Sequence, residues 1–139
     1  MTSREMPYAS TPVGSDLIRV LVVDDTDHVR RMLTTMLAVD GFEVVGGGAS
    51  DGPAAITAVT EQSPDVVVID YKMPAMDGLE TARRIRAEHP DQHVIIYTAF
   101  AAPEVEAAAA EIGVAVCLGK VEGLGPLEQE IRRLATQLR

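Results

Sequence analysis

The residues with the richest chemistry follow short apolar runs. Residues 21–23 precede two aspartates, residues 66–69 a third, residues 95–97 a threonine, and residues 116–118 come just before a lysine. These polar residues are Asp24, Asp25, Asp70, Thr98 and Lys120. Three carboxylates that lie close together repel one another and resist ionisation. A hard divalent cation relieves that repulsion, and Mg²⁺ prefers carboxylate oxygens and water as ligands. The set therefore predicts a Mg²⁺ site, provided that the fold brings its members together.

The same set suits the transfer of a phosphoryl group. One carboxylate can act as a nucleophile towards phosphorus. A cation and an ammonium neutralise charge on the equatorial oxygens in the transition state, and Lys120 is the candidate ammonium. The hydroxyl of Thr98 can donate a hydrogen bond to a phosphoryl oxygen. Each residue alone would be an ordinary cap, strand or surface residue, so the prediction depends on the combination.

Five apolar runs are the elements that must position these groups. Four of the five are dense in Val and Ile and nearly continuous, which is typical of strands buried on both faces of a parallel sheet. The runs cover residues 18–23, 42–45, 66–69, 94–97 and 114–118. Ligands of such sheets bind beyond the carboxyl ends of the strands, where the polar residues lie.

Helical periodicity separates the apolar runs. Apolar residues repeat at helical spacing within residues 29–37, 56–59, 79–85, 105–112 and 127–138. The expected helix starts are Thr26 or Asp27, Asp51, Asp77 and Pro103. Gly41 and Gly113 are the expected stops. We expect Arg83, Arg84 and Arg86 on the solvent face of the third helix. Alternating strands and helices predict an α/β fold with a parallel sheet covered on both faces.

Composition bounds the class of protein. The 139 residues suit one domain, and the net charge of −9 disfavours binding to nucleic acid or anionic lipid. Cys117 is the only cysteine, so no internal disulfide can form, which suits a reducing compartment. No apolar stretch approaches the length of a membrane span, and residues 1–16 lack the apolar run of a signal peptide. We expect a cytoplasmic protein with residues 1–16 as a flexible N-terminal tail.

Four stretches together resemble the receiver domains of two-component response regulators. They are Val22-Val23-Asp24-Asp25, Asp70-Tyr71-Lys72-Met73-Pro74-Ala75-Met76-Asp77-Gly78, Thr98-Ala99 and Lys120. The resemblance covers about residues 18–138 and assigns residues 17–139 to one receiver domain similar to single-domain chemotaxis regulators. It implies a flavodoxin-like fold, a doubly wound five-stranded parallel sheet of order 2-1-3-4-5 with five helices.

The resemblance also implies a role for each site residue. Asp70 would be the phosphoacceptor. Asp25, Asp70 and the backbone carbonyl of Lys72 would bind Mg²⁺ directly, and Asp24 would hold a metal-bound water. Thr98 would contact the phosphoryl group together with the lysine that follows the fifth strand, Lys120. Met73, Pro74 and Gly78 are expected to shape the loop after the phosphoacceptor.

The implied partners are proteins. The phosphodonor would be a sensor histidine kinase or a histidine phosphotransfer protein, and a small acyl phosphate could replace it. Because the chain ends at Arg139 with no output domain, we expect a single-domain switch rather than a turnover enzyme. It would reach a downstream protein through the face made by the fourth helix, fifth strand and fifth helix, and could form a homodimer there.

The sequence departs from the family pattern in places and leaves room for other functions. Cys117 stands where receivers commonly carry Phe or Tyr, so coupling to the surface would be weak or would use Tyr97 or Phe100. A degenerate receiver that acts as a phosphorylation-independent scaffold is the main alternative. A phosphohydrolase with an aspartate nucleophile is a further alternative. Such enzymes resemble one another in a second aspartate two residues after the nucleophile, and Lys72 occupies that place, which argues against this class. Lys72 and Phe100 would also shield an aspartyl phosphate from water, which predicts a long-lived phosphoprotein.

Overall fold

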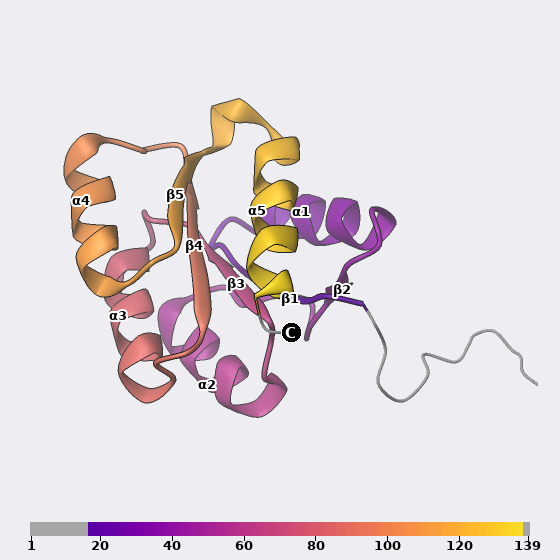
Figure 1. Ribbon diagram of the computed structural model, residues 1–139, viewed down its shortest axis with the longest axis horizontal. Coiled ribbons are helices and arrows are strands. Elements are labelled where there is room, and N and C mark those ends of the chain that lie inside the picture. Colours follow the sequence, from indigo (N-terminus) through magenta and orange to yellow (C-terminus); the bar gives the residue numbers. More distant parts are fainter. Residues whose placement is uncertain (1–16, 138–139) are drawn as a thin grey trace, which may run out of the picture.

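A five-stranded parallel sheet forms the centre of the molecule. The structure is a computed structural model that describes residues 17–137, so the expected tail and Leu138 lie outside the described residues. The strands are β1 (Arg19–Val23), β2 (Glu43–Val44), β3 (Val66–Ile69), β4 (His93–Thr98) and β5 (Val116–Gly119). Their order in the sheet is β2-β1-β3-β4-β5, and all pairs are parallel (Figure 1). The predicted flavodoxin-like topology is confirmed.

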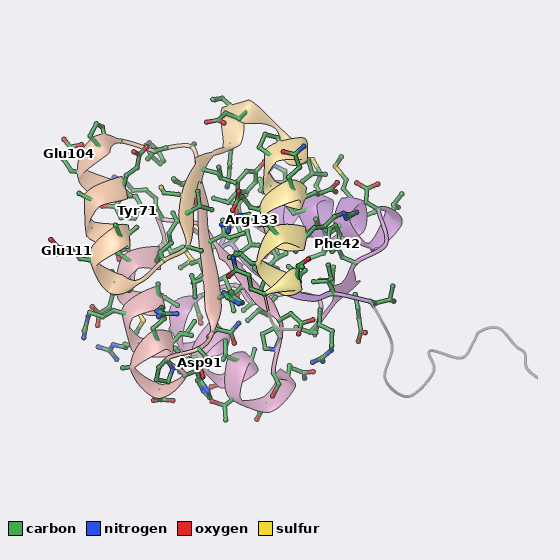
Figure 2. The ribbon with its side chains drawn as sticks, in the orientation of Figure 1. Phe42, Tyr71, Asp91, Glu104, Glu111 and Arg133 are labelled. Atoms are coloured by element: carbon green, nitrogen blue, oxygen red, sulfur yellow. The ribbon has the colours of Figure 1, made fainter. Side chains whose placement is uncertain are left out.

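Helices cover both faces of the sheet. They are α1 (Asp27–Val39), α2 (Gly52–Gln62), α3 (Gly78–Glu88), α4 (Pro103–Ile112) and α5 (Leu124–Thr136). Figure 1 shows α1 and α5 on one side of the strands and α2, α3 and α4 on the other. Glu104 and Glu111 project outward from α4, away from the sheet (Figure 2). Among residues 17–137, no helix combines the length and the apolarity that crossing a bilayer requires.

Alternate residues of each central strand enter opposite cores. In β1, Leu21 and Val23 pack in the cluster that includes Ala55 and Val59 of α2. Val20 and Val22 pack in the other cluster, which includes leucines of α1 and α5. Because both faces are covered, the strand residues must be apolar without alternation, and this explains the continuous Val and Ile runs.

Aspartate side chains cap the N-termini of α2 and α3. The Asp51 carboxylate accepts a hydrogen bond from Ala54 N (2.8 Å), and the Asp77 carboxylate accepts one from Glu80 N (2.9 Å). Both are the expected N-caps, and each satisfies an amide that the helix leaves free. Thr26 occupies the cap position of α1, but its side chain makes no capping bond.

The structure differs from the sequence prediction at the start of β5 and at Arg86. The run at residues 114–118 was expected to be a strand, yet β5 begins only at Val116. Val114 N donates to the carbonyl of Ala109, so this buried residue closes α4 instead of opening β5. The expectation for Arg86 was wrong. Its guanidinium is partly buried and donates to the carbonyls of Ile112 (3.2 Å) and Gln92 (2.6 Å).

Candidate functional site: an acidic pocket at the carboxyl edge of the sheet

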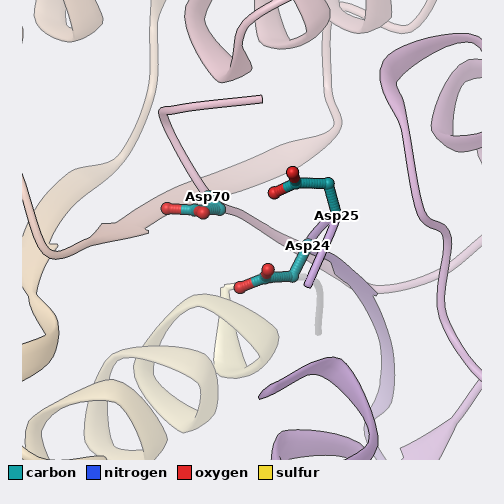
Figure 3. Close-up of side chains that lie close together, drawn as sticks. All are labelled: Asp24, Asp25 and Asp70. Carbon is teal, nitrogen blue, oxygen red and sulfur yellow. The ribbon is translucent and has the colours of Figure 1, made fainter. Parts of the chain in front are cut away.

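The register of β1 and β3 sets the level of the three aspartates. Val23 pairs with Ile69, so the chain leaves the two neighbouring strands at the same height. Asp24 and Asp25 follow the first strand and Asp70 the second, and ligating oxygens of the three carboxylates all lie within 4.8 Å of one another. Figure 3 shows the three carboxylates gathered at this edge. The sheet therefore brings Asp70 together with an acid pair that is 45 residues earlier in the sequence.

Lys120 and Thr98 reach the same pocket from the other strands. The Lys120 Nζ lies 2.9 Å from Asp24 Oδ2 and 3.7 Å from Asp70 Oδ1. Thr98 ends β4 and is fully buried, and its hydroxyl accepts a hydrogen bond from Phe100 N (3.1 Å) and helps to lower the pKa of the Asp70 carboxyl. All five polar residues singled out by their position after apolar runs are thus neighbours in the fold.

The surroundings of Asp70 disfavour its charge. Burial is the main cause that raises the pKa of the Asp70 carboxyl above its ordinary value, and the charge of Asp24 adds to the effect. The Lys120 ammonium, the Tyr71 amide and the Thr98 hydroxyl act in the opposite direction. The carboxylate would therefore gain from a nearby cation, because a cation stabilises its ionised form.

Asp24 is held by the protein at each of its polar groups. Its N–H donates to the Ala49 carbonyl (3.1 Å), and its carbonyl accepts from Arg30 Nη1 (2.8 Å). Its Oδ1 accepts from Thr26 N (2.9 Å) and its Oδ2 from Lys120. Asp25 differs, because within residues 17–137 no hydrogen bond or ion pair engages its carboxylate. Asp24 is thus fixed and Asp25 is free to coordinate.

Gly78 allows the start of α3 to touch the backbone of Asp70. Its N–H donates to the Tyr71 carbonyl (2.7 Å). A Cβ at this position would lie 2.2 Å from the Asp70 carbonyl oxygen, which is far inside contact distance. The sequence suggested only that Gly78 shapes the loop, and the structure gives the reason that no side chain fits.

Lys72 and Phe100 contact each other between two of the loops at the carboxyl edge of the sheet. They lie in the loops after β3 and β4, the strands that lead to Asp70 and Thr98. The Lys72 ammonium lies 5.1 Å from the centroid of the Phe100 ring, within the range of a cation–π contact. Both side chains are exposed.

Cys117 and Tyr97 occupy adjacent strands beside the pocket. Cys117 is half-buried rather than fully buried, and burial raises the pKa of its thiol. The Tyr97 ring is buried and its hydroxyl donates to the Gly123 carbonyl (3.1 Å), in the segment that follows Lys120. Tyr97 therefore links β4 to the chain beyond the lysine.

The donor set is suited to a hard divalent cation. Among residues 17–137 it offers carboxylate oxygens only, without sulfur or imidazole, and the Asp25 carboxylate has no hydrogen-bond or ion-pair partner among these residues. Mg²⁺ keeps several waters and binds through few carboxylates, which matches a site in which the Asp70 side chain is only partly buried. A carboxylate nucleophile, a cation and an ammonium within one pocket can transfer a phosphoryl group.

Comparisons with a family model and with curated proteins both match response regulators. The family model described as "Response regulator receiver domain" matches residues 20–132. The response regulator GacA of Pseudomonas viridiflava is 41% identical over 117 residues, which are 84% of this chain and 54% of GacA. The chain thus spans about half the length of the curated relative that it matches.

Solved structures share the fold. The response regulator TrrA of Thermotoga maritima, in complex with Mg²⁺–BeF, is 27% identical with a TM-score of 0.76, and the match covers 85% of this chain and 99% of that one. The chemotaxis protein CheY4 of Vibrio cholerae is also 27% identical, with a TM-score of 0.78 and coverage of 85% and 98%.

Proposed function

This chain belongs to the response regulator receiver family, and on that premise we propose that it is a switch that accepts a phosphoryl group on Asp70 in a Mg²⁺-dependent reaction. One observation carries the proposal. The Asp70 carboxyl lies in one pocket with two further carboxylates, a lysine ammonium 3.7 Å away and a buried threonine hydroxyl. Family members are signalling switches, and those that are enzymes carry their activity within larger proteins.

The chain's own oxygens would hold the metal. Asp25 and Asp70 would bind Mg²⁺ directly together with the backbone carbonyl of Lys72, and Asp24 would hold a metal-bound water. The free carboxylate of Asp25 and the fixed one of Asp24 support this division. When bound, the cation supplies charge neutralisation for the phosphoryl oxygens.

The remaining groups act on the phosphoryl group. An Asp70 oxygen forms a bond to phosphorus while the bond from phosphorus to the donor atom breaks, and the donor leaves with that electron pair. Lys120 exchanges its contact with Asp24 for one with a phosphoryl oxygen, and the Thr98 hydroxyl donates to another. The donor is the phosphohistidine of a sensor kinase or phosphotransfer protein.

The output passes by protein contact. We assign residues 1–16 to a tail and 17–139 to a receiver domain that acts on its own in the cytoplasm. Its target contacts the face made by α4, β5 and α5, where homodimerisation would also occur. The single cysteine and the acidic charge support a cytoplasmic role without nucleic acid.

Intact-mass spectrometry tests the proposal. The protein is incubated with acetyl phosphate and either Mg²⁺ or a chelator. We expect one added phosphoryl group with Mg²⁺ only, and none for Asp70→Asn. Asp91→Asn is the matched control, because Asp91 is exposed in the connection between α3 and β4, at the opposite edge of the sheet (Figure 2). Absence of added mass in the wild type would favour the scaffold alternative.

A further inference from the structure

Arg30 is the partly buried cation that contacts the backbone of the acid pair. It lies in the first turn of α1, and its side chain is 15% exposed. Nη1 donates to the Asp24 carbonyl (2.8 Å) and Nη2 to Asp27 Oδ1 (2.7 Å). One planar guanidinium therefore ties the turn that carries Asp24 and Asp25 to the start of the following helix.

The loop after β2 leaves room for the Arg30 stem. Gly48 has a positive φ of 91°, and a Cβ there would lie 3.0 Å and 3.1 Å from the Arg30 Cδ and Cγ. The same Cβ would lie 2.8 Å from the carbonyl oxygen of Val22. The methylenes of Arg30 thus pack between α1 and a glycine that lies against β1, which limits where the guanidinium can go.

The Asp24 carbonyl that accepts from Arg30 lies in the backbone between Asp24 and Asp25. Asp24 C=O belongs to the peptide unit that joins Asp24 to Asp25, so its orientation sets the direction in which the Asp25 backbone leaves β1. The Asp25 carboxylate has no protein partner of its own within residues 17–137. Its position therefore depends on this peptide unit, and Arg30 is the side chain that holds the unit.

The charge of Arg30, taken alone, would weaken Mg²⁺ binding at the aspartates. A positive guanidinium close to a divalent cation repels it. Asp27 partly offsets that charge through its ion pair, but the Asp27 side chain is 68% exposed, so the offset is screened by water. The effect of removing the guanidinium on Mg²⁺ affinity therefore has one sign if Arg30 acts by position and the other if it acts by charge.

We propose that Arg30 is a positioning residue of the metal site, which orients the Asp24–Asp25 peptide so that Asp25 faces Asp70. The inference rests on the proposed Mg²⁺-dependent function. Groups that orient metal ligands typically change metal affinity about 10- to 100-fold when removed. Loss of the guanidinium should accordingly weaken Mg²⁺ binding by about tenfold or more, although it removes a repelling charge.

Calorimetric titration of the full chain with Mg²⁺ alone tests this. Arg30→Met keeps a stem of similar length and removes both donors. Arg30→Lys keeps the charge and loses the two-pronged geometry, so its dissociation constant should fall between those of Arg30→Met and the wild type. Arg31→Met is the matched control, because Arg31 is an exposed neighbour on the same helix with the same charge. Its dissociation constant should stay within about twofold of the wild type, since exposed charges are screened.

A local spectroscopic signature separates positioning from general destabilisation. In NMR spectra of the metal-free protein, Arg30→Lys should shift or broaden the amide signals of Asp24 and Asp25. The amide signals of β4 and β5 should stay unchanged. If Arg30→Met binds Mg²⁺ as tightly as the wild type or more tightly, the inference is overturned and the proposed function stands. Should Arg30→Met fail to fold, a wild-type affinity of Arg30→Lys overturns it equally. If the wild type itself binds no Mg²⁺, the proposed function fails and this inference with it.

Discussion

Gly78→Ala is the substitution whose effect the structure defines most closely. The added Cβ would lie 2.2 Å from the Asp70 carbonyl oxygen, 3.0 Å from the Asp70 carbonyl carbon and 3.0 Å from the Tyr71 Cα. All three are backbone atoms, so no side chain can turn away to relieve the contact. The start of α3 and the backbone of Asp70 must move apart.

The size of that movement gives the expected magnitude. Real Cβ contacts do not fall below 3.0 Å, so the two backbones must separate by at least about 0.8 Å. Overpacking of this kind costs about 1–3 kcal/mol of unfolding free energy. For a domain of this size that lowers Tm by about 4–12 °C. A displacement near 1 Å at a reacting group costs about 100-fold in rate.

Two assays and one control variant check the reasoning. Thermal unfolding followed by circular dichroism measures Tm. The initial rate of phosphorylation by acetyl phosphate with Mg²⁺ reports the loss of rate that a displaced Asp70 should cause. Gly125→Ala is the control, because a Cβ at Gly125 in α5 meets open space. It should leave Tm and rate unchanged or raise Tm slightly. A Gly78→Ala protein with wild-type rate and Tm would refute the close approach of α3 to Asp70.

Three further predictions concern the Lys72–Phe100 contact, a carboxyl on α5 and a helix cap. The Lys72–Phe100 contact is worth about 0.5–1 kcal/mol at an exposed site, so Phe100→Ala should speed hydrolysis of the aspartyl phosphate by about two- to fivefold. Decay of the phosphorylated mass measures it, and an unchanged lifetime would contradict shielding. Burial, followed by the neighbouring Asp40 carboxyl, raises the pKa of Glu128 to about 7 from 4.5. The proton bound to folded Glu128 contributes stability that is complete below pH 4.5 and lost as pH rises through about 7. Urea unfolding should show this slope for the wild type and a flatter one for Glu128→Gln, and equal slopes would refute it. Asp51→Ala should lower the unfolding free energy by about 1 kcal/mol in the same assay, because Ala54 N loses its partner, and no loss would count against the cap.

Sequence reasoning succeeded where one physical signal dominated. Burial on both faces leaves only apolar residues in the central strands, so β3 is found with its observed bounds, Val66–Ile69. Parallel strands end at one edge, so the proximity of Asp24, Asp70 and Lys120 could be anticipated across 96 residues of separation. The caps Asp51 and Asp77 have local signals, because a short polar side chain precedes each helix.

Features that depend on tertiary contacts were missed. Val114 is apolar like the strand that follows, and only its bond to Ala109 assigns it to the end of α4. Arg86 looks like a surface charge, because the carbonyls to which it donates, those of Gln92 and Ile112, come close to it only in the folded chain. Arg30 has no signal that separates it from its exposed neighbour Arg31, since its role depends on the gap that Gly48 leaves.

The most direct test identifies the residue that carries the phosphoryl group. The protein is incubated with Mg²⁺ and acetyl phosphate, reduced with borohydride, which converts an aspartyl phosphate to homoserine, and digested for tandem mass spectrometry. We expect homoserine at position 70, with none in samples that lack donor or Mg²⁺. Homoserine at Asp24 or Asp25 in place of Asp70, or no homoserine at any position, would contradict the assignment of Asp70 as the phosphoacceptor.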